Sequence, residues 1–176
     1  MALKLTELAR MSIEAHLEED VFVPDKDTKK KYSKKGACFV TLTKNKQLRG
    51  CIGSLEAVKE LWKDVQENAI NAAFKDSRFP ALATGEFGEI KIEVSVLSPA
   101  EKLIAKNSAH LLEKIDKHMG IILKHGQHTA TFLPQVWEEI PNKEKFLEQL
   151  SLKAGIDKHD WKDSELWFYT VTSEKE

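Results

Sequence analysis

The chain has 176 residues and a mass of 20.0 kDa, with 41% apolar and 31% charged residues, which suffices for one domain with a hydrophobic core or for two small subdomains. Its formal net charge of −1 gives no overall attraction to nucleic acid or to an anionic membrane surface. No apolar run approaches the roughly 20 residues that span a bilayer, and two cysteines are too few for a disulfide framework or a four-cysteine zinc site.

These totals favour a globular protein of the reducing cytoplasm. The first residues, Met1–Leu5, lead directly into a helical pattern and contain no signal-peptide core. We expect no metal and no other cofactor.

The first predicted element is a helix from Leu5 to about Asp20, because apolar residues recur there at the spacing of one helix face. The segment 25–35 is rich in lysine. A phosphate-contacting patch is one interpretation of it. A solvated loop is favoured, because no arginine accompanies the lysines.

Residues 36–52 are predicted to form a β-hairpin, with strands over 36–43 and 47–52 and a turn at 44–46. Two registers are compatible with this turn. If the turn centres on Lys44 and Asn45, Cys38 lies opposite Cys51; one residue later, Val40 does. The first register permits a redox pair, but two separate buried thiols are favoured.

The segment Arg49-Gly50-Cys51-Ile52-Gly53 is the candidate site. Glycines within a strand mark a close approach of a ligand or of another backbone. In an extended strand Arg49 points to the same side as Cys51, and a nearby guanidinium lowers the pKa of a thiol.

Ser54 is predicted to be the N-cap of a helix that runs to about Phe74. The leading amides of that helix would then face Cys51 and favour an anion there. In the link that follows, Asp76 and Arg78 either pair with each other, cap the helix end, or join the ligand-binding set.

The cleanest strand pattern covers Ile90–Leu97, where apolar and polar residues alternate. Glu93 lies in its middle and faces either solvent or a cleft. The remaining predicted elements are a helix capped by Asn107 or Ser108 and closed by Gly120, a hairpin over 121–133 with its turn at 125–127, a helical turn over 135–140, a helix from Asn142 to Gly155, and a strand over 166–172 followed by a frayed end.

Several segments together resemble the AMMECR family. They are Gly36–Leu42, Leu48–Gly53, Asp76–Pro80, Ile92–Pro99, Ala130–Trp137 and Lys153–Gly155. The chain departs from the family pattern at Ser77 and Ala81, where the family usually has proline, and at Ser151, where it often has cysteine.

The resemblance implies an α+β fold, with a strongly bent, barrel-like antiparallel sheet flanked by helices and two subdomains with a cleft between them. Residues 1–176 would form a single domain of this type, or two intertwined subdomains. The resemblance also implies association with Memo-type and radical-SAM proteins.

Two functions fit this segment. A binding module would recognise a small anionic ligand or a partner segment, with Arg49 as a bidentate clamp. Its ligand-binding set is Arg49, Gly50, Gly53, Ser54, Asp76 and Arg78. An enzyme would use Cys51 as a nucleophile, with Glu93 or His128 as acid or base. Binding is preferred because it requires fewer precisely placed groups than catalysis does. Nucleic acid is disfavoured as a partner.

Overall fold

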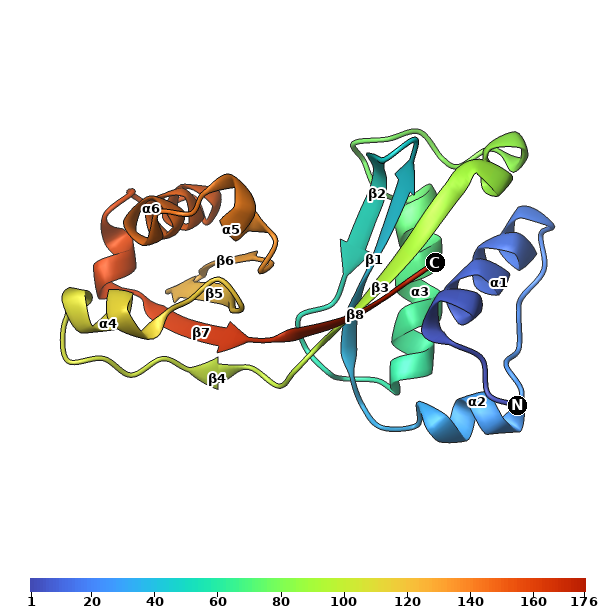
Figure 1. The fold of residues 1–176 in the computed structure, drawn as a ribbon, viewed down its shortest axis with the longest axis horizontal. Helices are drawn as coiled ribbons and strands as arrows, with labels where there is room; N and C mark the ends of the chain where they lie inside the picture. The colour runs from blue at the N-terminus through green and yellow to red at the C-terminus, as the bar shows by residue number, and fades with distance from the viewer. The chain divides into compact units, whose positions relative to one another are not determined.

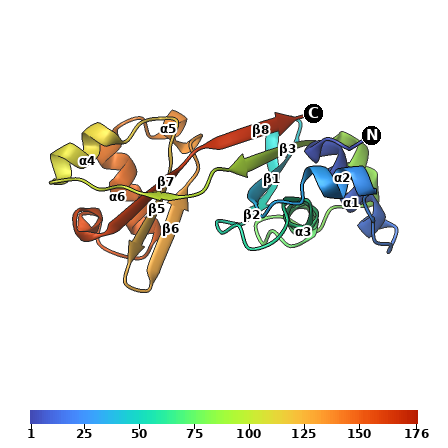
Figure 2. The same cartoon turned by 90° about the horizontal axis from the view of Figure 1, so that it is seen from below.

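The computed structural model describes all 176 residues, which form two compact units. The first unit comprises residues 1–97 and 172–176, and the second comprises residues 98–171. Each unit combines helices with its own four-stranded sheet (Figure 1 and Figure 2). The expectation of an α+β fold is therefore confirmed. The strands are divided between two four-stranded sheets and do not form a closed barrel.

The sheet of the first unit has the strand order β2-β1-β3-β8. Its strands are β1 (Ala37–Lys44), β2 (Gln47–Gly53), β3 (Ile90–Leu97) and β8 (Val171–Lys175). β1 pairs antiparallel with both β2 and β3. β2 is therefore an outer strand, and one of its edges has no strand neighbour.

Helices α1 (Leu5–Leu17) and α3 (Leu61–Phe74) pack on one face of this sheet (Figure 1). The apolar stripe predicted from the spacing of Leu5, Leu8 and Ile13 is buried in the core of the unit. Cys38, Val40 and Leu42 of β1 also belong to this core, since side chains alternate between the faces of a strand. The other face of the sheet carries the intervening, more polar residues.

The predicted lysine-rich loop is wrong in part, because residues Lys26–Lys31 form a short helix, α2. Asp25 caps it by accepting a hydrogen bond from the Thr28 amide at 2.7 Å. Thr28 is fully buried and its hydroxyl accepts a hydrogen bond from the Leu3 amide, so α2 is joined to the start of the chain.

The predicted final strand divides in two. β7 (Glu165–Tyr169) belongs to the sheet of the second unit, and β8 belongs to that of the first. The expectation of a frayed end after residue 172 is wrong. Glu174 accepts hydrogen bonds from the amide and hydroxyl of Thr6, and Glu176 pairs with Arg10 on α1.

In the second unit the strand order is β4-β7-β5-β6. The other elements are β4 (Glu101–Lys102), α4 (Ser108–Lys114), β5 (Gly120–His125), β6 (His128–Phe132), α5 (Val136–Glu139), α6 (Lys143–Lys153) and the 3-10 helix η2 (Asp160–Asp163). The core includes Trp137 and Phe146, whose rings stack with centroids 3.6 Å apart.

The predicted β5–β6 hairpin and the helix capped by Asn142 are confirmed. Helix α4 begins after Asn107 as predicted, but ends at Lys114 instead of reaching Gly120. Gly120 instead opens β5, where a Cβ atom would lie 2.2 Å from the Tyr169 ring. None of the helices has both the length and the apolar character that crossing a bilayer requires.

Candidate functional site

A one-residue irregularity in β2 sets the geometry of the candidate site. The turn places positive φ angles at Asn45 and Lys46, and Lys44 pairs with Gln47. The register then shifts between Leu42 and Thr43, so that Arg49 has no partner on β1. This is a β-bulge, which re-aims the side chain of the extra residue.

Because of the bulge, Cys51 lies opposite Thr41, and both registers expected for it are wrong. The Thr41 Oγ1 and Cys51 Sγ atoms are hydrogen-bonded at 3.2 Å. Cys38 lies three positions from Thr41 and therefore on the opposite face of the sheet. It is fully buried in the core, and both cysteines are free thiols. The two cysteines do not form a redox pair in this geometry.

The Arg49 side chain reaches η1 (Thr84–Glu89). Its Nε and Nη2 atoms donate to Glu86 at 3.2 and 3.0 Å. Only 7% of Arg49 is exposed, and its Nη1 atom is buried without a hydrogen-bond partner. The Arg49 guanidinium lowers the pKa of Glu86 to about 2.

The prediction that Arg49 lowers the pKa of Cys51 is therefore wrong. Burial raises the pKa of this thiol, which the Thr41 hydrogen bond and the charge of Arg78 offset only in part. The thiol is half-buried, and it stays protonated at neutral pH.

The two glycines serve close packing within the unit. A Cβ atom at Gly50 would lie 2.1 Å from the backbone oxygen of Ala72 in α3. A Cβ atom at Gly53 would lie 2.3 Å from the Phe39 ring. The space expected to admit a ligand beside these glycines is occupied by the protein itself.

Ser54 does not cap α3, which begins seven residues later behind Glu60. The Ser54 hydroxyl instead donates to Asp64 at 2.7 Å. The leading amides of α3 are also engaged elsewhere, since Leu61 donates to the Lys34 carbonyl at 2.9 Å and the next amide reaches the Tyr32 carbonyl. The expectation that they face Cys51 is wrong.

Asp76 and Arg78 do pair, as one of the predicted alternatives proposed. Arg78 donates from Nε and Nη2 to the Asp76 carboxylate at 3.0 and 2.8 Å. The same carboxylate accepts from the Cys51 amide at 3.0 Å, and Arg78 Nη2 reaches the Cys51 carbonyl at 3.4 Å. The pair thus forms hydrogen bonds with both the backbone amide and the backbone carbonyl of Cys51. Hydrogen bonding to Arg78 holds the pKa of Asp76 well below its ordinary value.

The Phe79 ring lies near the guanidinium groups of both Arg49 and Arg78. The Cζ atom of Arg49 lies 6.0 Å from the centre of this ring, and that of Arg78 lies 5.5 Å from it. The two guanidinium groups differ in access, however. The side chain of Arg78 is 56% exposed and that of Arg49 only 9%.

Glu93 lies beside Thr41 in the register of β1 and β3, so Cys51, Thr41 and Glu93 form a row across three strands. Its carboxylate is 3.4 Å from the Lys175 ammonium. His128 belongs to the other unit, where it is exposed and its Nδ1 atom is 3.0 Å from the Ala154 carbonyl.

The sequence did not predict three interactions: the hydrogen bond between Thr41 and Cys51, the ion pair between Arg49 and Glu86, and a buried hydrogen-bonded pair in α3. The pair is Asp64 and Asn68, hydrogen-bonded to each other at 3.0 Å. These two residues fall among the apolar positions of α3, so polar residues one turn apart on a buried helix face were the available signal. Nothing local indicates Glu86.

The chain is similar to known proteins along nearly its whole length. The AMMECR1 family model matches residues 6–175. A protein of Nanoarchaeum equitans is 40% identical over 172 residues, which cover 95% of this chain and 94% of that protein. A protein of Methanopyrus kandleri is 41% identical over 167 residues, which cover 89% of this chain and 78% of that protein.

A solved structure is also similar. The crystal structure of an uncharacterised protein from Pyrococcus horikoshii matches with a TM-score of 0.90 and 32% sequence identity. The match covers 98% of this chain and 89% of that one.

Proposed function

The chain belongs to the AMMECR1 family, and from this premise we propose that it is a binding module that recognises a carboxylate or phosphate group beside Arg78. The Arg78 guanidinium carries the proposal. It is held in position by Asp76, it is 56% exposed, and its Nη1 atom makes no hydrogen bond. A fixed, accessible guanidinium loses little conformational entropy when it binds an oxyanion.

Arg78 replaces Arg49 in the role of anion clamp. Arg49 is buried and gives two of its three nitrogen atoms to Glu86, so it has no free fork to offer. Arg49 would instead stabilise the wall on which Phe79 and Arg78 rest.

Recognition is favoured over nucleophilic catalysis by Cys51. Burial raises the pKa of the thiol, and thiolate is the reactive form. The group hydrogen-bonded to the thiol is the Thr41 hydroxyl, which is not a general base at neutral pH. Glu93 is paired with Lys175 and lies beyond Thr41 in the row.

The experiment uses Cys51 as a reporter of the charge beside it. The intact protein is alkylated with iodoacetate, which is anionic, and with iodoacetamide, which is neutral. The same thiolate attacks both reagents and displaces iodide from each, so the ratio of their rates reports the local attraction for anions and not the pKa of Cys51. Cys38 is fully buried and should contribute nothing.

Changing Arg78 to Gln should lower the iodoacetate-to-iodoacetamide ratio by about threefold or more, the effect of removing one nearby charge at high dielectric. Lys75→Gln is the matched control, an exposed lysine of the same segment, and should leave the ratio near that of the unaltered protein. Phosphate should slow alkylation of the unaltered protein but not of the Arg78 variant. A ratio that is the same in both proteins would contradict the proposal.

The same chemistry extends to a protein partner. We propose that an acidic segment of a Memo-type or radical-SAM protein, the association implied by the resemblance to the family, contacts Arg78 in place of phosphate. A purified partner of this kind should protect Cys51 from iodoacetamide in the unaltered protein. Protection that persists in the Arg78→Gln variant would place such a partner elsewhere on the surface.

A further inference from the structure

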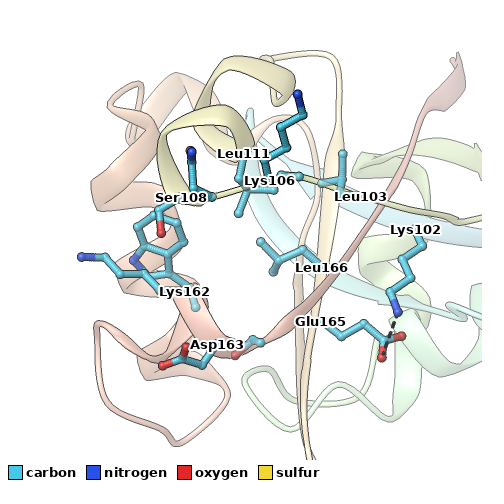
Figure 3. Close-up of a pocket in the computed structure, with 13 residues that line it drawn as sticks. Lys102, Leu103, Lys106, Ser108, Leu111, Lys162, Asp163, Glu165 and Leu166 are labelled. Carbon is cyan, nitrogen blue, oxygen red and sulfur yellow. Dashed lines mark ion pairs between the residues drawn. The ribbon is translucent and has the colours of Figure 1, made fainter.

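The second unit contains a pocket that none of the candidate-site residues discussed above lines. It is formed by β4, the segment that follows it, the start of α4, η2 and the start of β7 (Figure 3). Its volume is about 510 Å³. Small-molecule sites commonly measure roughly 300–1,000 Å³, so the pocket is large enough for a small organic ligand.

The inner wall of the pocket is apolar. Leu111, Trp161 and Leu166 line it, and all three also belong to the core of the second unit. The Leu111 and Leu166 side chains face the space that the labelled residues surround (Figure 3). At most 8% of any of these three residues is exposed, so an apolar ring placed there would bury only a small further area of apolar surface.

The rim of the pocket is mainly cationic. Lys102, Lys106 and Lys162 lie on it with two carboxylates, those of Asp163 and Glu165. The Lys102 ammonium lies 3.7 Å from the Glu165 carboxylate, so these charges largely cancel. Lys162 lies over the Trp161 ring, and the Lys106 ammonium has no partner. The two remaining lysines exceed the one remaining carboxylate, that of Asp163, by a single positive charge, which favours an anion.

The wall also contains an unsatisfied donor. Trp161 is 1% exposed, and its indole Nε1 atom has no hydrogen-bond partner. The Nε1 atom is enclosed by the protein, so a ligand in the pocket does not reach it.

We propose that this pocket binds a small aromatic carboxylate. The apolar body would lie against Leu111, Trp161 and Leu166, and the carboxylate would lie near Lys106 and Lys162. Two features point to this class of ligand: the apolar wall favours the ring, and the ammonium groups of Lys106 and Lys162 favour the negative charge. This site is separate from Arg78 and does not depend on the function proposed for it.

The probe is 2-naphthoate, with 2-naphthalenemethanol as its neutral analogue, each titrated into the full chain by calorimetry and by the fluorescence of the tryptophans. Ordinary ligand efficiency for a molecule of this size gives a Kd for 2-naphthoate at or below about 1 mM. The neutral analogue should bind about tenfold more weakly, because it lacks the attraction to Lys106 and Lys162.

Lys106→Glu should weaken 2-naphthoate binding by about tenfold and leave the analogue unchanged. Lys145→Glu is the matched control, because Lys145 is also exposed, belongs to the same unit and does not line the pocket. Both variants alter exposed side chains, and circular dichroism should confirm that they fold. Equal affinities for the two probes, equal effects of the two variants, or no saturable binding near 1 mM would each overturn the site.

Discussion

The carboxylate of Asp76 accepts a hydrogen bond from the backbone amide of Cys51 at 3.0 Å and so joins the segment after α3 to the outer strand β2. Arg78, held by the same carboxylate, reaches the Cys51 carbonyl. An outer strand leaves its N–H and C=O groups open to pairing with other chains. The Asp76–Arg78 pair occupies both groups at Cys51, so it covers this part of the edge whether or not a ligand is bound.

Asp76→Asn should lower the free energy of unfolding by about 2 kcal/mol at pH 7, since a buried carboxylate that accepts several hydrogen bonds would lose its charge. Because the folded pKa of Asp76 is depressed, its contribution is complete above the ordinary value of about 3.9 and is lost as pH falls through the folded pKa. The difference between the proteins should therefore shrink below pH 4. Urea unfolding at several pH values measures it. The exposed Asp163→Asn change should cause no such loss, and an equal loss there would refute the assignment.

Glu86→Gln removes the counter-charge of Arg49, which is 7% exposed. An uncompensated buried guanidinium is costly, but Glu86 is one-quarter exposed and water screens the pair, so we expect a loss of about 1–2 kcal/mol. Glu89→Gln is the control, because Glu89 is more exposed and contacts only Lys44. It should cost under about 0.5 kcal/mol. Chemical denaturation measures the free energy of unfolding of both variants. Equal losses would show that the ion pair of buried Arg49 contributes no more than the exposed pair between Lys44 and Glu89.

Gly50→Ala should destabilise the first unit by about 2 kcal/mol or more, because the added Cβ atom meets the Ala72 backbone oxygen at 2.1 Å and one of the two elements must move. Gly85→Ala meets nothing within 4 Å and should be neutral or slightly stabilising. Thermal unfolding distinguishes the two. A Gly50 variant as stable as the Gly85 variant would mean that β2 and α3 are not packed this closely.

Cys51 should be alkylated with a half-maximal rate at a pH above about 8.5, the ordinary value for a free thiol, because burial raises its pKa. Thr41→Val removes a hydrogen bond that lowers this pKa, so the midpoint should move higher still. Mass spectrometry of iodoacetamide-treated protein gives the profile, with Ser33→Ala as a control for an unrelated hydroxyl. A midpoint below 8 would revive Cys51 as a nucleophile.

The sequence predicts the elements whose signals are local. Helix α1 follows from its apolar spacing, α6 from the Asn142 cap and Gly155, and the β5–β6 hairpin from its turn. The division between β7 and β8 was missed because the β pattern continues through Thr170, and only pairing with distant strands assigns the two halves to different sheets. Helix α2 was missed because lysine content outweighed the Asp25 capping signal.

The site shows the same limit. The Asp76–Arg78 pair could be predicted because its members are two residues apart. The partner of Arg49 could not, since Glu86 is 37 positions away and the bulge that turns Arg49 towards it has no local signature. That bulge lies directly before Gly50, where β2 packs closely against α3, which is a tertiary constraint.

The strand β8 has a consequence for biosynthesis. As the nascent chain leaves the ribosome, residues 1–97 emerge well before residues 171–175, with the whole second unit translated in between. Until translation reaches β8, strand β3 has an unsatisfied backbone edge that another chain could occupy. The first unit therefore completes its sheet only after the second has been synthesised.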